Sequence, residues 1–177
     1  LGAGSWFHTT VNETSNDEIT NPSSLSQRRA TQYVYDFVSR YGNRTSVLFW
    51  ELGNELNLLV NLPGSFCSNP KGKQVKGQCF NTRQMVAYNQ ALIAAIRKAE
   101  PSTRPIRPIS SGFSTPRLSA WHQEHCPLKG SCAADPGSGY WTNDTTKQRI
   151  ERAIAQNQGR DNWSLHSYDN VYGTGTT

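Results

Sequence analysis

Amphipathic helical segments alternate with short apolar runs along this chain of 177 residues. In the first segment, apolar side chains recur from Ala30 to Tyr41 at helical spacing, and Gly42 follows as the expected end. Similar patterns predict a second helix that begins near Thr82 and a third over residues 145–157. The third helix is expected to direct three apolar side chains inward, those of Ile150, Ala153 and Ile154.

The apolar runs between these helices have the length and composition of strands. They cover residues 47–53, 106–112 and 162–168. Strands that alternate with helices favour a parallel sheet with right-handed crossovers, so the fold class expected is α/β. No linker separates two halves of the chain, and residues 1–177 are predicted to form a single domain.

Composition and charge narrow the classes of partner. The chain is 35% hydrophobic and 18% charged, which is typical of a globular protein, and its net charge is +5. The basic residues are scattered rather than gathered in a stripe, so we expect a solvated surface and no nucleic-acid partner. No run approaches the ~20 apolar residues of a membrane helix. The sequence has no initiating Met and no signal peptide, and we interpret it as mature, processed or partial.

Four cysteines fall in two close pairs. Each pair encloses a loop rich in turn-forming residues: Cys67 with Cys79, and Cys126 with Cys132. No Cys-x-x-Cys pattern accompanies them, so two local disulfides are predicted, with free buried thiols as the alternative. Disulfides of this kind indicate an oxidising compartment.

Four N-glycosylation sequons support the same location. Their acceptor residues are Asn12, Asn43, Asn143 and Asn162. Together with the predicted disulfides, they favour a secreted, extracellular glycoprotein.

The run from Val47 to Leu52 ends in Asn54 and Glu55, which makes Glu55 the first candidate catalytic group. A carboxylate at the carboxyl end of a parallel strand lies where α/β barrels build active sites. Cleavage of a glycosidic bond needs such an acid together with a second carboxylate. Glu51 fails as that partner, because four residues of extended strand would separate the two by about 13 Å. The alternative for Glu55 is a capping or salt-bridged carboxylate.

A second set of candidates lies near the end of the chain and in the loops. His166 and Tyr168 share one face of the predicted last strand, where they can bond sugar hydroxyls, although a buried structural histidine is the alternative. Trp6, Trp121 and Trp141 lie in predicted loops, where an indole ring can stack on a sugar.

Three segments together resemble one enzyme family. Phe49–Glu55 resembles the fourth-strand signature of clan A glycoside hydrolases, and the closest likeness is to family 5, the cellulase and β-mannanase family. Ile109–Gly112 is similar to the fifth strand of that family, and Leu165–Tyr168 to its sixth-strand His-x-Tyr. The segments occur in the same order as in the family.

The resemblance implies a (β/α)8 TIM barrel, of which this chain would supply roughly strands three to six. It implies a retaining mechanism with no cofactor and no metal, on a β-linked polysaccharide or oligosaccharide such as a glucan or mannan. Glu55 matches the general acid/base, and Asn54 the residue that bonds the sugar 2-hydroxyl. His166 and Tyr168 match the pair that borders the nucleophile, and His8 loosely matches a substrate-binding histidine.

The chain also departs from the family. The nucleophile of the family is a Glu on the seventh strand, and this sequence contains no match to it. A full barrel has about 250 residues. Two alternatives therefore stand beside the enzyme. One is a non-catalytic glycan-binding or structural glycoprotein. The other is a partial barrel completed by self-association or by the remainder of a longer protein.

Overall fold

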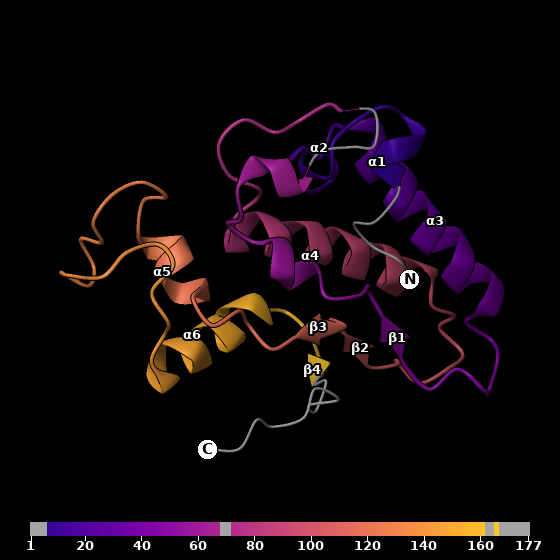
Figure 1. Cartoon of the computed structure of the whole chain (residues 1–177). Helices are drawn as coiled ribbons and strands as arrows, with labels where there is room; N and C mark the ends of the chain where they lie inside the picture. The colour runs from indigo at the N-terminus through magenta and orange to yellow at the C-terminus, as the bar shows by residue number, and fades with distance from the viewer. Residues whose placement is uncertain (1–6, 68–71, 162–164, 167–177) are drawn as a thin grey trace, which may run out of the picture.

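The computed structural model describes residues 7–67, 72–161 and 165–166, and their regular structure is mostly helical (Figure 1). The helices are α1 Phe7–Thr10, α2 Ser15–Thr20, α3 Leu25–Tyr41, α4 Thr82–Ala99, α5 Ala120–His125 and α6 Thr146–Gln156. Two 3₁₀ helices, η1 Leu56–Leu59 and η2 Gly64–Cys67, lie between α3 and α4 in the sequence. No helix in this part of the chain is long and apolar enough to span a bilayer.

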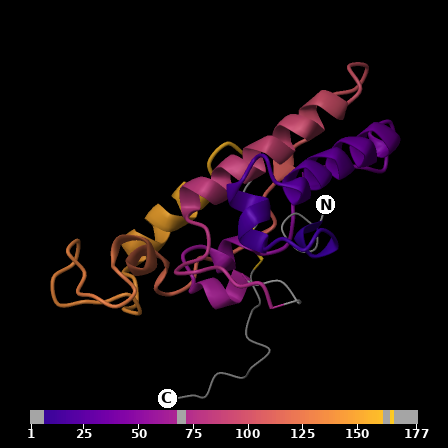
Figure 2. The ribbon, with the colours of Figure 1, turned by 90° about the horizontal axis from the view of Figure 1, so that it is seen from above.

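The two long helices confirm the helical periodicity. The Ser24 hydroxyl accepts the Gln27 amide at the start of α3, and Asn81 with Gln84 forms a capping box at the start of α4. Their apolar faces supply much of the core, with Ala30, Val34 and Val38 from α3 and Met85, Tyr88, Leu92 and Ile96 from α4. The two helices lie side by side, with α1 and α2 packed against them (Figure 2).

The strands pair in parallel, as the alternating pattern predicts, but each is only two residues long. In one sheet, β1 (Trp50–Glu51) pairs with β2 (Ile109–Ser110), with Glu51 opposite Ser110. In the other, β3 (Phe113–Ser114) pairs with β4 (Leu165–His166), with Ser114 opposite His166. The carboxyl end of β1 is therefore brought near the carboxyl end of β4.

The prediction of a (β/α)8 TIM barrel portion is wrong. The described residues form two separate two-stranded sheets, and no continuous sheet contains all four strands. The start of the first apolar run is unpaired, so that Leu48 is 76% exposed and Phe49 51% exposed. Gly112 has a left-handed backbone (φ 66°) between β2 and β3, and a Cβ there would lie 1.9 Å from the Gly53 carbonyl oxygen. This tight approach interrupts the strand and bends the chain.

Helix α6 is inverted relative to its apolar pattern. Ile150 and Ile154 are exposed, whereas Arg152 and Gln156 are buried, so the expected inner face is wrong. Both buried side chains have polar partners: a terminal guanidinium nitrogen of Arg152 pairs with Glu124 of α5, and Gln156 accepts a hydrogen bond from Asn57. Buried polar side chains are normally hydrogen-bonded, and these contacts explain how α6 can bury a polar face.

Both predicted disulfides are confirmed, Cys67–Cys79 and Cys126–Cys132. The first closes the long segment between β1 and α4, where an antiparallel bridge from Pro63 to Gln78 adds order. The second follows α5, a short helix within a segment that the sequence pattern left irregular.

Candidate active site

Glu55 lies four residues beyond the end of β1 and directly precedes η1. Its backbone is left-handed (φ 55°), and its amide donates to the Gly112 carbonyl at 2.7 Å. A non-glycine residue held in this conformation costs about 1 kcal/mol or more. The bond to Gly112 fixes the turn, so the close approach that interrupts the sheet also orients Glu55.

The imidazole of His166 lies between two carboxylates. Its Nδ1 is 3.7 Å from Oε1 of Glu55, and its Nε2 is 3.7 Å from Oε1 of Glu51. These separations are too long for hydrogen bonds and correspond to ion-pair contacts when the ring is protonated. The side chains of Glu55 and His166 are 18% and 26% exposed, so the cluster is partly shielded from solvent.

One oxygen of Glu55 is distinctive. Oε1 has almost no accessible surface and accepts no hydrogen bond from the residues that the structure describes. Buried polar atoms are normally hydrogen-bonded, and exceptions gather at functional sites. The oxygen that faces His166 is thus the one without a hydrogen bond among the described residues.

Glu51 is much closer to this site than an extended strand would allow. The ring of His166 is flanked by Glu51 on one side and by Glu55 on the other. The expected separation of about 13 Å assumed that the strand continues. Strand β1 instead ends at Glu51, and the backbone becomes left-handed at Glu55, whose amide is bonded to Gly112.

A buried amide supports the strand that carries His166, and the sequence pattern did not single it out. Asn57 receives the Ser114 amide at 3.1 Å and donates to the Ser114 carbonyl at 2.8 Å. Ser114 in turn donates its hydroxyl to the His166 carbonyl at 3.3 Å. Asn57 follows Glu55 by two residues. The same short segment therefore carries Glu55 and the amide that holds Ser114 next to His166. In the sequence, the only indication of a role for Asn57 was its position close to Asn54 and Glu55.

The other predicted site residues are distributed differently. Asn54 is exposed next to Glu55. His8 is buried in α1, where its Nδ1 and its backbone amide each lie 3.0 Å from Oε2 of Glu18. The Tyr88 hydroxyl donates to the other Glu18 oxygen, which ties α1 and α2 to α4. Trp6 and Tyr168 lie outside the described residues.

Of the sequon asparagines, Asn12, Asn43 and Asn143 are exposed, as an acceptor must be, and Asn162 lies outside the described part.

A hollow elsewhere in the described structure lies apart from the cluster of Glu51, Glu55 and His166. A hollow of about 330 Å³ is lined by α4, α5 and α6 residues such as Arg83 and Glu124, and it touches neither Glu55 nor His166. Within residues 7–67, 72–161 and 165–166, no three His, Cys, Asp or Glu side chains gather as metal ligands.

A scan against models of known protein families gives no match for this chain, and a search of curated proteins gives none either. The functional interpretation therefore rests on the residues and their geometry.

Proposed function

We propose that this protein is a glycoside hydrolase that cleaves a β-linked polysaccharide or oligosaccharide such as a glucan or mannan. Glu55 is its general acid/base. The observation that carries the proposal is the shielded Oε1 of Glu55, which has no hydrogen bond among the described residues and lies 3.7 Å from His166 Nδ1. The resemblance of Phe49–Glu55 to a glycoside hydrolase signature supports it.

In this proposal, each carboxylate and the imidazole between them has a separate role. Glu55 protonates the oxygen of the leaving sugar while a nucleophilic carboxylate, for which this sequence contains no match, bonds to the anomeric carbon of the other sugar. Glu55 then accepts a proton from the water that displaces this carboxylate and releases the second sugar. His166 lies on the Glu55 side of the cluster, where an imidazolium stabilises the carboxylate after it has given up its proton. Glu51 contacts the opposite ring nitrogen and fixes the orientation of the imidazole.

The setting that fits this chemistry is extracellular. Two disulfides are present, and the three described sequon asparagines are exposed. We propose a secreted glycoprotein that meets its polysaccharide outside the cell and uses no cofactor.

The test is hydrolysis of β-glucan and β-mannan oligosaccharides by the wild type and by Glu55→Gln, read as released reducing ends. We expect the variant to lose about 10²–10⁴-fold in rate, the typical contribution of a general acid/base. An aryl glycoside whose leaving group needs no protonation should lose less in its first step. Glu151→Gln, an exposed carboxylate of α6, is the matched control and should keep full activity.

Full activity in Glu55→Gln would overturn the assignment of the acid. A wild type that cleaves none of these substrates but binds them, measured by calorimetry, would favour the non-catalytic glycan-binding protein instead. The observation that favours this second candidate is the indole of Trp141, which is 60% exposed and can stack on a sugar.

A further inference from the structure

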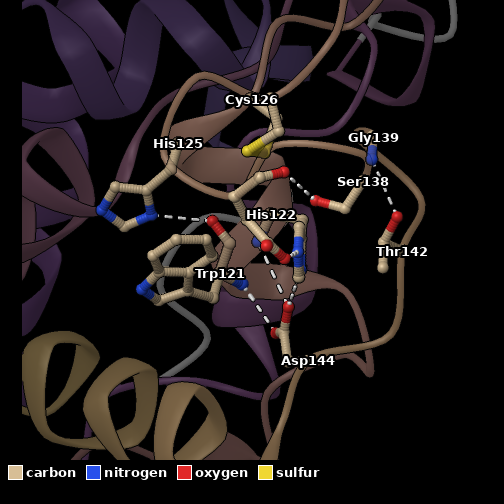
Figure 3. The surroundings of a disulfide bond; sticks show 10 residues. Trp121, His122, His125, Cys126, Ser138, Gly139, Thr142 and Asp144 are labelled. Atoms are coloured by element: carbon tan, nitrogen blue, oxygen red, sulfur yellow. Dashed lines mark hydrogen bonds and ion pairs between the residues drawn. A yellow bond between two sulfur atoms is a disulfide. The ribbon is translucent and has the colours of Figure 1, made fainter.

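A second histidine, His122 of α5, also lies between two carboxylates, those of Asp135 and Asp144, and its contacts are shorter than those of His166. Figure 3 shows its ring beside Asp144. Its Nδ1 is 2.7 Å from Oδ1 of Asp144, and its Nε2 is 3.0 Å from Oδ2 of Asp135. The imidazole is 1% exposed. Only the imidazolium has a proton on both nitrogens, so only the charged ring donates to both carboxylates at once.

The two carboxylates are held very differently. Asp144 is buried and also accepts the backbone amides of Trp121 and His122, at 2.7 and 3.2 Å, at the start of α5. The side chain of Asp135 is 46% exposed and belongs to a turn in which the amide of Ser138 donates to the Asp135 carbonyl. If the ring loses one proton, Asp144 keeps its other donors, and the Asp135 contact is the one that breaks.

We propose that His122 is a pH-sensitive clasp: the protonated ring bridges Asp144 and Asp135 and holds the 133–138 turn against α5, and its deprotonation releases that turn. The turn lies between the Cys126–Cys132 disulfide and Tyr140, whose hydroxyl donates to the Asn61 carbonyl. Both flanks are therefore anchored, and the motion is confined to the turn itself.

Other charged groups on the neighbouring elements have partners of their own. His125 bonds the Trp121 carbonyl at 2.8 Å and stacks on the Trp121 ring. Glu124 pairs with Arg152 of α6, and Arg117 donates to Gln123. Among the described residues, Asp135 and Asp144 are thus the charged groups that contact the ring of His122.

The direction of the pH response follows from the two contacts. Burial opposes the charged ring, but the hydrogen bonds that the ring donates to Asp135 and Asp144 outweigh it and raise the pKa of His122 above its ordinary value. The same contact lowers the pKa of Asp135. The clasp is therefore closed in acid and opens as the pH rises above the usual histidine range.

The test is amide hydrogen exchange of Ser138, whose amide donates to the Asp135 carbonyl in this turn, between pH 5 and 9, corrected for the intrinsic rate, with NMR titration of the His122 ring. In the wild type we expect protection of the turn to fall about tenfold as His122 deprotonates, the loss of one charge-assisted hydrogen bond. In Asp135→Asn, protection should be low at every pH. Asp36→Asn, an exposed position on α3, is the matched control and should behave as the wild type.

Protection that does not change with pH, or an Asp135→Asn variant that matches the wild type, would overturn the clasp. His122→Gln provides a second variant, because a glutamine cannot gain or lose the proton and the pH dependence should disappear. The amides of α4 provide the internal reference that separates opening of the turn from global unfolding. None of these measurements depends on the proposed hydrolase activity.

Discussion

The two histidines that lie between carboxylates show how the same trio of groups can serve opposite purposes. His122 is almost fully buried, and its nitrogens lie 2.7 and 3.0 Å from their carboxylates. His166 is 26% exposed and lies 3.7 Å from each of Glu51 and Glu55. The first site satisfies its groups and holds a turn in place. The second leaves a carboxylate oxygen without a hydrogen bond, which is how a group available for chemistry is kept.

The neighbouring backbone explains the difference. Asp144 lies at the start of α5, where free amides point at it, and a negative charge is stabilised there. Glu55 has its own amide bonded to Gly112 and a left-handed backbone, so its side chain is directed by a strained turn. The two carboxylates therefore differ in their main-chain donors: two backbone amides donate to Asp144, whereas Oε1 of Glu55 accepts no hydrogen bond among the described residues.

The largest effect should come from Glu55→Gln, which separates activity from stability. We expect hydrolysis to fall by about 10²–10⁴-fold. The free energy of unfolding in urea should change by less than about 0.5 kcal/mol, because Oε1 accepts no hydrogen bond among the described residues. A large loss of stability would show that Glu55 is structural and would remove the contrast between the two sites.

Asp144→Asn should show the reverse behaviour. It leaves a buried imidazolium with only the exposed Asp135 as a charged partner, and breaking such a buried pair costs about 3 kcal/mol. The measurement is the urea midpoint at pH 5.5, with hydrolysis assayed where the variant is still folded. A stability equal to that of the wild type would contradict a structural role for this site.

Glu51→Gln should sharpen the description of the catalytic cluster. Because Glu51 contacts the nitrogen of His166 that faces away from Glu55, its loss should affect orientation and reduce kcat by about tenfold, with KM nearly unchanged. Glu51→Asp should recover part of the rate. An increase in KM alone would assign Glu51 to substrate binding.

The smallest effect concerns pH and distinguishes the wild type from Asp135→Asn. The pKa of His122 is raised in the folded protein, so its stabilisation is fully present below the unfolded value of about 6.5. It is lost as the pH rises through the folded pKa. The Tm difference between wild type and Asp135→Asn should therefore be greatest in acid and shrink toward pH 9. A difference that grows with pH would reverse the sign and exclude the clasp.

Local features were predictable from the sequence. The spacing of Ala30, Val34 and Val38 defines α3, and the predicted start of the second helix near Thr82 matches the first residue of α4, although the capping residue is Asn81. The disulfides join cysteines only 12 and 6 residues apart in the sequence, so the chain between them has few other partners to choose. Each of these features depends on neighbours within a few turns of chain.

The strands and the inner face of α6 were not predictable in this way. The run from Val47 to Leu52 has the composition of a buried strand, yet only Trp50 and Glu51 find a partner. Ile150 and Ile154 have helical spacing but face outward, because Arg152 and Gln156 are bonded on the inner side. The composition of a segment shows which secondary structure it can form, but its contacts with the rest of the chain decide which residues pair and which face is buried.

By itself, the sequence determined the long helices and the cysteine pairs, because these depend on short-range spacing. Only the tertiary structure decided that His166 lies between Glu51 and Glu55, and that His122 lies between Asp135 and Asp144. The physical reason is that such contacts depend on where the chain turns. Turns such as those at Glu55 and Gly112 are fixed by hydrogen bonds between segments far apart in the sequence.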